Sequence, residues 1–423
     1  MRVSIPPLRV LALASLLACW AACGGTNTAP VSSVDGGGGS SGGSSGGSGG
    51  GSGGGSGGSS GSSSGGGSGS GGGSGSGSGG NEAGVCPPCD PGNVNLPGGT
   101  CDLDCSGTTS PPGPCDATLA VGGPATDFAK ALGICQMATG GSWGLVSATY
   151  TQGYDTTTAP NAGQHGLLPK FGSVILPREG TTLGVLSSGY ALPCDDASQT
   201  ATCAASGTGD PYFKGAQTGM DATGSVAPPG YPKGTAACAV TGTVFDTIGV
   251  TLKIKVPNNV AGMSFDFDFY SSEWPEYVCS TYDDQFVAWL QSEAWPGNGG
   301  DLNLAKDSTG NPISVNTPFL NRCTPGTPTG CAGTVTGTAT CQVGTAELQG
   351  TGFYNLGTYC TTQSTGGGAT GWLTTTAPVK GGETITLQLI IWDTGDANWD
   401  SSLLLDDLKW YAASKPVTTS PSQ

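Results

Sequence analysis

Residues 262–291, GMSFDFDFYSSEWPEYVCSTYDDQFVAWLQ, carry the clearest strand pattern in this chain. Met263 and the three phenylalanines that follow it alternate with Ser, Asp and Tyr residues, which is the period-two pattern of a strand that buries one face. Residues 285–290 form a second apolar strand. The turn-rich segment between the two strands carries four carboxylates, Glu273, Glu276, Asp283 and Asp284. The stretch therefore predicts two core strands joined by an acidic loop.

Other segments extend this interpretation. Four more strands are predicted from alternating or continuous apolar patterns, at residues 143–150, 244–256, 383–392 and 403–410. The third of these is apolar on both faces, so we expect a central strand that is covered on two sides. A short amphipathic helix is predicted near residues 126–135. With Gly- and Pro-rich turns, these features predict a mainly β fold, a β-sandwich or jelly roll with long loops and one or two short helices.

The N-terminus, residues 1–23, has the pattern of an export signal. Two arginines precede the apolar run of residues 10–22, which is too short to span a bilayer and is typical of a signal peptide. Cys19 and Cys23 end this run, and either fits the acylated cysteine of a lipoprotein. Removing both from the 16 cysteines leaves an even number that can all pair, which favours Cys23. We expect an extracytoplasmic protein held at the outer membrane or cell surface, with a cleaved, secreted form as the alternative.

A long Gly- and Ser-rich segment follows the signal. Residues 36–80 contain only these two amino acids, so no apolar side chain offsets the conformational entropy lost on ordering. We therefore predict a disordered tether over residues 24–85, with a root-mean-square reach of roughly 40 Å for its Gly/Ser core. Such a tether suits a folded module that is held away from a membrane.

The remaining cysteines are predicted to form disulfides. Residues 86–114 are Cys-rich with near-zinc spacing, but in an exported chain disulfides are favoured over a metal site. Cys194 and Cys203 bracket a short polar loop and are expected to pair locally, and the other connectivities stay open. The predicted disulfide cysteines are Cys86, Cys89, Cys101, Cys105, Cys115, Cys135, Cys194, Cys203, Cys238, Cys279, Cys323, Cys331, Cys341 and Cys360.

The charge balance limits the partners. The chain has 14 Lys and Arg against 30 Asp and Glu, which gives a net charge of −16. Such a surface repels nucleic acid and anionic lipid headgroups. We therefore expect no nucleic-acid partner, and favour a cation, a neutral glycan or a protein as the ligand.

The segment FDFYSSEWPEYVCSTYDDQFVAWL resembles the signature of the choice-of-anchor L domain. Three further blocks resemble the same family: AKALGICQ with WGLVSATY, LLPKFGSVILPREGTTLGVLSSG, and IIWDTGDANWDSSLLLDD. We place this β domain at residues 115–412, followed by a polar tail at residues 413–423. The resemblance implies an extracytoplasmic bacterial surface module without established catalytic residues. This chain departs from the usual arrangement because its expected anchor is an N-terminal lipid and not a C-terminal sorting signal.

Acidic loops make calcium the strongest metal candidate. Hard oxygen ligands on β-loops suit Ca²⁺, although the DTGDANWD spacing lacks the glycine and closing Glu of an EF-hand. The alternative is that these aspartates cap turns and bond backbone N–H groups. The candidate ligands are Asp283, Asp284, Asp393, Asp396, Asp400 and Asp407.

The enzymatic alternative is a secreted carbohydrate-active hydrolase that uses acidic residues of the 273–284 loop. However, Glu273 and Glu276 share one turn, which gives no reason for the carboxyl separation of roughly 5 Å or 6.5–9.5 Å that glycosidases need. A serine hydrolase is disfavoured because the single histidine, His165, lies in a Gly/Gln-rich loop, and the GGSWG motif at residues 140–144 precedes a strand. We expect no enzyme.

Three tryptophans in polar loops are candidates for ligand contact by stacking on sugar rings. They are Trp274, Trp295 and Trp399. The alternative is that they fill the ends of the sandwich. Taken together, the sequence predicts a lipid-anchored surface binding or adhesion module of unknown ligand, with calcium as a candidate stabilising ion.

Overall fold

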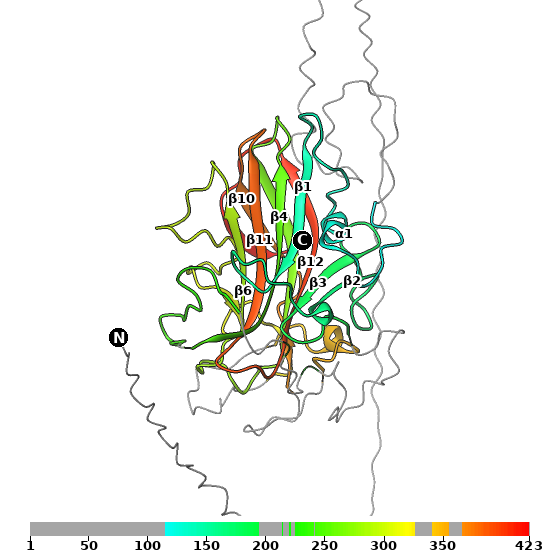
Figure 1. The fold of residues 1–423 in the computed structure, drawn as a ribbon. Coiled ribbons are helices and arrows are strands. Elements are labelled where there is room, and N and C mark those ends of the chain that lie inside the picture. Colours follow the sequence, from blue (N-terminus) through cyan, green and yellow to red (C-terminus); the bar gives the residue numbers. More distant parts are fainter. Residues whose placement is uncertain are drawn as a thin grey trace, which may run out of the picture. The chain divides into compact units, whose positions relative to one another are not determined.

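The computed structural model describes residues 115–193, 214, 220, 225–240, 242–325, 341–354 and 366–422 (Figure 1). The predicted signal peptide, Gly/Ser tether and Cys-rich segment lie outside the described residues. So do ten of the cysteines singled out above: Cys19, Cys23, Cys86, Cys89, Cys101, Cys105, Cys194, Cys203, Cys331 and Cys360.

The described residues form two antiparallel sheets, which confirms the predicted mainly β fold. The five-stranded sheet has the order β1 (Gly144–Thr151), β4 (Val244–Lys255), β11 (Thr384–Thr394), β6 (Gln285–Gln291) and β7 (Ile313–Ser314). The eight-stranded sheet runs β13 (Thr418–Pro421), β10 (Leu373–Pro378), β5 (Gly262–Ser271), β12 (Ser401–Tyr411), β3 (Leu183–Ser187) and β2 (His165–Leu168). In the same sheet β9 (Gly368–Ala369) pairs with β5, and β8 (Arg322–Cys323) pairs with β9.

Side chains from both sheets share one hydrophobic core. Phe267 of β5 and Phe286 of β6 pack with ring centroids 4.9 Å apart. Leu387 of β11 and Leu405 of β12 are fully buried in the same cluster. Each side chain of this size contributes about 1.5–3 kcal/mol when it is removed from water. The strand β11 is central, between β4 and β6, as its apolar sequence predicts.

The strand β5 keeps its predicted alternation, but both of its faces are buried. Its phenylalanines enter the main core. On the other face, Asp266 accepts hydrogen bonds from Arg178 Nε (3.0 Å) and Thr374 Oγ1 (2.7 Å). Asp268 accepts one from Thr370 Oγ1 (3.2 Å). Loops and neighbouring strands therefore cover a face that the period-two pattern assigns to solvent.

The helical content is small, as predicted. The helix α1 (Ala125–Ala131) contacts β1, β2 and β3, and Figure 1 shows it beside these strands. Two short 3₁₀ helices, η1 (Ala162–Gln164) and η2 (Ala346–Leu348), lie in loops. In the part of the chain that the structure covers, no helix has the length and apolar character needed to span a membrane.

Three disulfides connect described cysteines. They are Cys115–Cys135, Cys238–Cys279 and Cys323–Cys341. The second of these joins the segment before β4 to the acidic loop after β5. The three bridges therefore hold long loops against the sheets, which have few helices to cover them.

The polar C-terminal segment carries a strand that the sequence analysis does not foresee. The strand β13 pairs with β10 in antiparallel register at the edge of the larger sheet. The hydroxyls of Thr375 and Thr419 lie 2.8 Å apart across this pair. Because β13 is mostly exposed, its sequence lacks the apolar alternation by which strands are recognised.

Candidate functional site

The acidic loop after β5 is buried. Glu273 is 2% exposed, and one of its carboxylate oxygens accepts a hydrogen bond from the backbone N–H of Asp284 (3.1 Å). Asp284 accepts hydrogen bonds from the backbone N–H of Thr394 (3.1 Å) and from the Ser401 hydroxyl (2.6 Å). Thr394 ends β11 and Ser401 begins β12. The loop is therefore tied to strands of both sheets.

Burial dominates the electrostatics of a group that we call the buried carboxylate cluster, Glu273, Asp284, Asp393 and Asp400. Desolvation raises the pKa of Glu273, Asp284 and Asp393 well above the usual range. The charges of Asp284 and Asp400 raise the pKa of Asp393 further. Carboxylates in such a setting are neutralised by protons or by a cation.

The structure brings together only part of the predicted calcium set. Asp284, Asp393 and Asp400 belong to the buried carboxylate cluster. Asp283 instead accepts hydrogen bonds from Gln285 Nε2 (2.9 Å) and Asn316 Nδ2 (2.8 Å).

The last two candidates serve other local contacts. Asp396 accepts from the backbone N–H of Asn398 (3.1 Å), as a turn aspartate does. Asp407 forms an ion pair with Lys409. Within the described ranges, no group of three or more His, Cys, Asp and Glu side chains is placed to hold a metal ion. The calcium site stays a prediction.

The three candidate tryptophans have different surroundings. Trp274 is 4% exposed and packs in a hydrophobic cluster with the cysteines of two disulfides. Trp399 is half-buried, with its ring centroid 6.0 Å from that of Tyr277. Trp295 is also half-buried, and it lines a pocket. Of the three, Trp295 therefore has the surroundings that a ligand contact requires.

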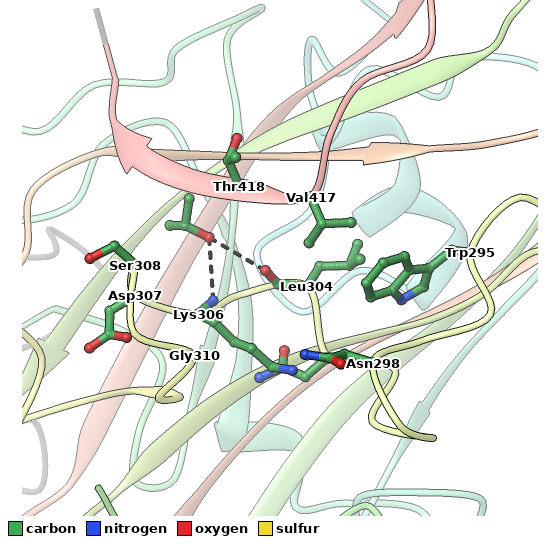
Figure 2. Close-up of a pocket in the computed structure, with 11 residues that line it drawn as sticks. Trp295, Asn298, Leu304, Lys306, Asp307, Ser308, Gly310, Val417 and Thr418 are labelled. Carbon is green, nitrogen blue, oxygen red and sulfur yellow. Dashed lines mark hydrogen bonds between the residues drawn. The ribbon is translucent and has the colours of Figure 1, made fainter. Parts of the chain in front are cut away.

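The pocket has a volume of about 420 Å³, within the range of small-molecule sites. Two segments form it, residues 295–310 between β6 and β7 and residues 417–419 at the start of β13. Figure 2 shows Trp295 at one end and Asp307 and Ser308 at the other. The lining residues are Trp295, Asn298, Asn303, Leu304, Lys306, Asp307, Ser308, Gly310, Val417, Thr418 and Thr419. We call this the Trp295 pocket.

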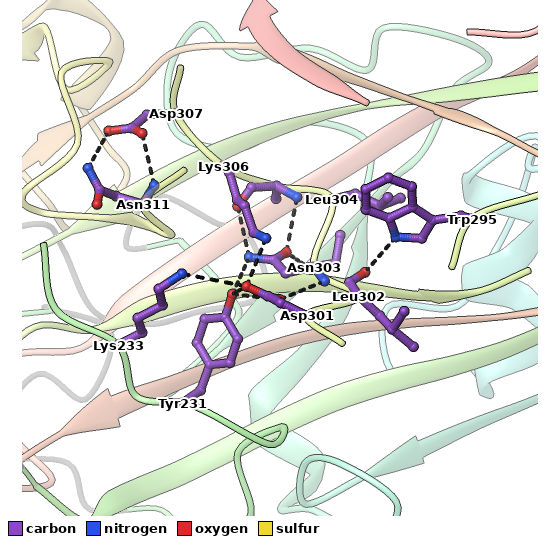
Figure 3. Close-up of polar contacts among 12 residues, drawn as sticks. Tyr231, Lys233, Trp295, Asp301, Leu302, Asn303, Leu304, Lys306, Asp307 and Asn311 are labelled. Carbon is purple, nitrogen blue, oxygen red and sulfur yellow. Dashed lines mark hydrogen bonds and ion pairs between the residues drawn. The ribbon is translucent and has the colours of Figure 1, made fainter. Parts of the chain in front are cut away.

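A charged network holds Lys306, one of the residues that line the Trp295 pocket (Figure 3). Asp301 forms ion pairs with Lys306 (2.8 Å) and Lys233 (3.6 Å). The Tyr231 hydroxyl lies 3.2 Å from both oxygens of Asp301. Burial alone would raise the pKa of Asp301, but Lys306 and the other partners lower it overall. The aspartate is therefore ionised and its partners are held in place.

Asn303 fixes the backbone of the same loop. It is fully buried, and its Oδ1 accepts hydrogen bonds from the backbone N–H groups of Ala288 and Ala305 (3.0 Å each). Its Nδ2 donates to Tyr231 Oη (3.0 Å) and to the Ala305 carbonyl (3.1 Å). Breaking such a buried set leaves groups unsatisfied at about 1–3 kcal/mol each. The loop is thus rigidly attached to β6.

A comparison with known families adds a match over part of the chain. Residues 235–408 match the choice-of-anchor L domain. This is a non-catalytic surface-protein domain type, so the match indicates a surface-associated bacterial protein. No curated protein and no solved structure matches the chain.

The choice-of-anchor L match and the Trp295 pocket overlap only in part. Residues 295–310 lie within the matched range, whereas residues 417–419 lie beyond its end. The strands β1, β2 and β3 precede the match, yet they pair into both sheets. The folded unit is therefore larger than the matched choice-of-anchor L residues.

Sequence reasoning selected Trp295 but missed the polar residues around it. Asn298, Ser308 and Thr418 lie in turn-rich or polar segments that predict loops and nothing more. The available signal was the run WPGNGGDLNLAKDSTGN at residues 295–311, where one aromatic residue is followed by many turn residues. The contribution of residues 417–419 had no sequence signal, because it depends on the pairing of β13 with β10.

Proposed function

We propose that this chain is a lipid-anchored binding module of the bacterial cell surface, and that its folded residues bind a ligand outside the cell. The observation that carries the proposal is the Trp295 pocket, a cavity of about 420 Å³ with fixed walls in a choice-of-anchor L chain. The predicted acylated Cys23 and the Gly/Ser tether supply the anchor and the distance from the membrane.

The geometry favours binding over hydrolysis of a glycan. A glycosidase needs two carboxyl groups that face each other across a substrate. Glu273 and Glu276 are buried and do not line the Trp295 pocket. Asp307, the one carboxylate among the lining residues, accepts hydrogen bonds from the backbone and side chains of Thr309 and Asn311 at 2.7–2.9 Å. Glu273 and Asp307 therefore have structural roles, and among the described residues that line the pocket no second carboxyl group faces Asp307.

The single histidine also has a structural role. The His165 ring stacks on Tyr150 with centroids 3.8 Å apart, and burial lowers the pKa of His165. Ser142, in the GGSWG motif, donates to the Thr139 carbonyl within a turn (2.8 Å). Neither contact provides an activated nucleophile.

The anchor is tested with the full chain in a bacterial host that processes lipoproteins. We expect a palmitate analogue to label the wild type and the Cys19→Ser variant but not Cys23→Ser. We call residues 115–423 the head. We also expect added protease to remove the head from intact cells. A head found in the cytosol, or label retained by Cys23→Ser, would contradict the proposed anchor.

Binding is tested separately on cells. Bacteria that display the full chain are compared with bacteria that lack it, on arrays of immobilised glycans and of extracellular proteins. We expect chain-dependent attachment to at least one array. Attachment equal to that of the chain-free cells on every array, or turnover of a glycoside by the head, would contradict a binding module.

A further inference from the structure

We propose that the Trp295 pocket binds an uncharged sugar unit of a glycan. This inference deepens the proposed function and rests on it, because it names the ligand class of the same site. Three features of the pocket carry it: an apolar wall with an indole, the engagement of its charged side chains in internal contacts, and unused polar groups at its rim.

The apolar wall is made by Trp295, Leu304 and Val417, as Figure 2 shows. The indole is held in place, because Nε1 of Trp295 donates to the Leu302 carbonyl (3.4 Å) and the ring packs against the main core. A pyranose ring has an apolar face of C–H groups, and a fixed aromatic surface offers contact area to it at little entropic cost.

The charged side chains that line the pocket already have partners within the protein. Lys306 Nζ is paired with Asp301 at 2.8 Å, and both Asp307 oxygens accept hydrogen bonds from Thr309 and Asn311. An anionic ligand would meet no unpaired cation here and would be repelled by the net charge of −16. A cationic ligand would have to compete for a carboxylate with those internal bonds. The lining therefore selects an uncharged ligand.

The rim supplies polar groups that match hydroxyls. Asn298 and Ser308 are exposed, and within the described residues neither side chain makes a hydrogen bond. The Asn298 amide offers donors and an acceptor, and the Ser308 hydroxyl offers both functions. Sugar hydroxyls also donate and accept, so these two side chains can be satisfied together by one saccharide.

The two walls are joined before any ligand arrives. Thr419 Oγ1 accepts a hydrogen bond from the Lys306 backbone N–H (3.3 Å) and donates to the Leu304 carbonyl (3.5 Å). Figure 2 shows these contacts bridging β13 to the 295–310 loop. A pocket that is already formed loses little conformational entropy on binding, which supports recognition of a ligand as small as one or two sugar units.

The test is a titration of the full chain followed by ligand-observed NMR. The probes are glucose, galactose, mannose, N-acetylglucosamine and their disaccharides, with glucuronate and glucosamine as charged counterparts. We expect saturation transfer to at least one neutral probe, and affinity for its charged counterpart reduced at least about tenfold, because the pocket offers no free charge to offset desolvation.

Variants connect the signal to the pocket. Ser308→Trp fills the cavity from an exposed position and is expected to abolish binding without unfolding the head. Trp295→Ala is expected to weaken binding about tenfold through loss of the stacking surface. Trp399→Ala, another half-buried loop tryptophan outside the pocket, is the matched control and should bind as the wild type does. Because Trp295 also packs against the core, Ser308→Trp keeps the test decisive if Trp295→Ala fails to fold.

Two outcomes would overturn the inference. One is no saturation transfer to any neutral probe, and the other is binding that survives Ser308→Trp. The proposed function is judged apart from it: chain-dependent cell attachment that persists with Ser308→Trp would leave the surface binding module standing and remove the sugar from this pocket.

Discussion

The contact between Phe128 and Gly184 shows how single residues set the packing of this head. Gly184 lies in β3, and the fully buried ring of Phe128 from α1 occupies the space beside it. A Cβ built on Gly184 would lie 2.5 Å from that ring. The missing side chain is therefore what allows α1, which also buries Ala125, Ala129 and Ala131, to lie close to the sheet.

We expect Gly184→Ala to lower the free energy of unfolding by about 1–3 kcal/mol, because the added methyl overpacks a buried contact. Chemical denaturation of the full chain measures this. Gly122→Ala is the matched control, since a Cβ there has no atom within 4 Å, and it should change stability by less than about 0.5 kcal/mol. Equal stability of the two variants would show that α1 does not depend on this contact.

At the scale of the elements, several buried carboxylates lie in or next to strands of both sheets. Asp268 of β5 has its pKa raised to about 7, chiefly by burial, and so does Asp283 before β6. Burial also raises the pKa of Asp406 in β12 to about 8. The sheets thus hold several acids that bind protons more tightly when the protein is folded.

The raised pKa values of these buried aspartates predict that the free energy of unfolding falls as pH rises. An unfolded Asp titrates near about 3.9, so between that pH and about 8 the native state holds more protons than the unfolded state. The stabilisation is complete below about pH 4 and is lost as pH increases through the raised values. We expect the melting temperature in EDTA to drop by several degrees from pH 5 to pH 9.

Asp268→Asn tests the residue assignment, because it should flatten the pH profile while the Thr370 contact is kept. A melting temperature that rises over pH 5 to 9 in EDTA would refute the effect.

Calcium gives a second prediction at this scale. If Ca²⁺ neutralises the buried carboxylate cluster, a hundredfold excess over its dissociation constant should stabilise the head by about 2.7 kcal/mol at pH 8. Thermal melts in EDTA and then in excess Ca²⁺ measure the shift. Asp393→Asn should abolish it, and Asp127→Asn, on the surface of α1, should leave it intact. Identical melts with and without Ca²⁺ would remove the metal hypothesis and leave protons as the neutralising charge.

For the whole molecule, the folded unit extends beyond the matched family range. β1 pairs with β4 and β3 pairs with β12, so strands from residues 144–187 complete both sheets. Their side chains Leu145 and Leu186 are in the main core. At the other end, β13 covers the edge of β10 and supplies one wall of the Trp295 pocket.

We therefore expect a fragment of residues 235–408 to fail to fold, because it would expose the edges of β4 and β12 and part of the core. Circular dichroism and a denaturant melt against residues 115–423 provide the comparison. A cooperative transition of the shorter fragment with the same midpoint would show that the upstream strands are dispensable.

The sequence alone was sufficient to predict strands wherever a hydrophobic pattern repeats along the chain. The alternation at 262–269 and the apolar run at 383–392 predict β5 and β11, because burial of a strand face imposes period two or continuous apolarity locally. The six described cysteines could also be selected for bridging, because the expected export favours disulfides over metal sites. Trp295 could be selected as an aromatic in a polar loop.

Tertiary structure decided what depends on segments that meet across the fold. Asp266 and Asp268 look solvent-facing in sequence, but Arg178, Thr370 and Thr374 cover them. Asp283 and Asp407 look like partners of Asp393, but Asp283 accepts hydrogen bonds from Gln285 and Asn316, and Asp407 pairs with Lys409 of its own strand. The pocket itself exists because β13 pairs with β10 and brings Thr419 to the 295–310 loop. Such encounters depend on long-range packing free energy, which no local pattern of residues records.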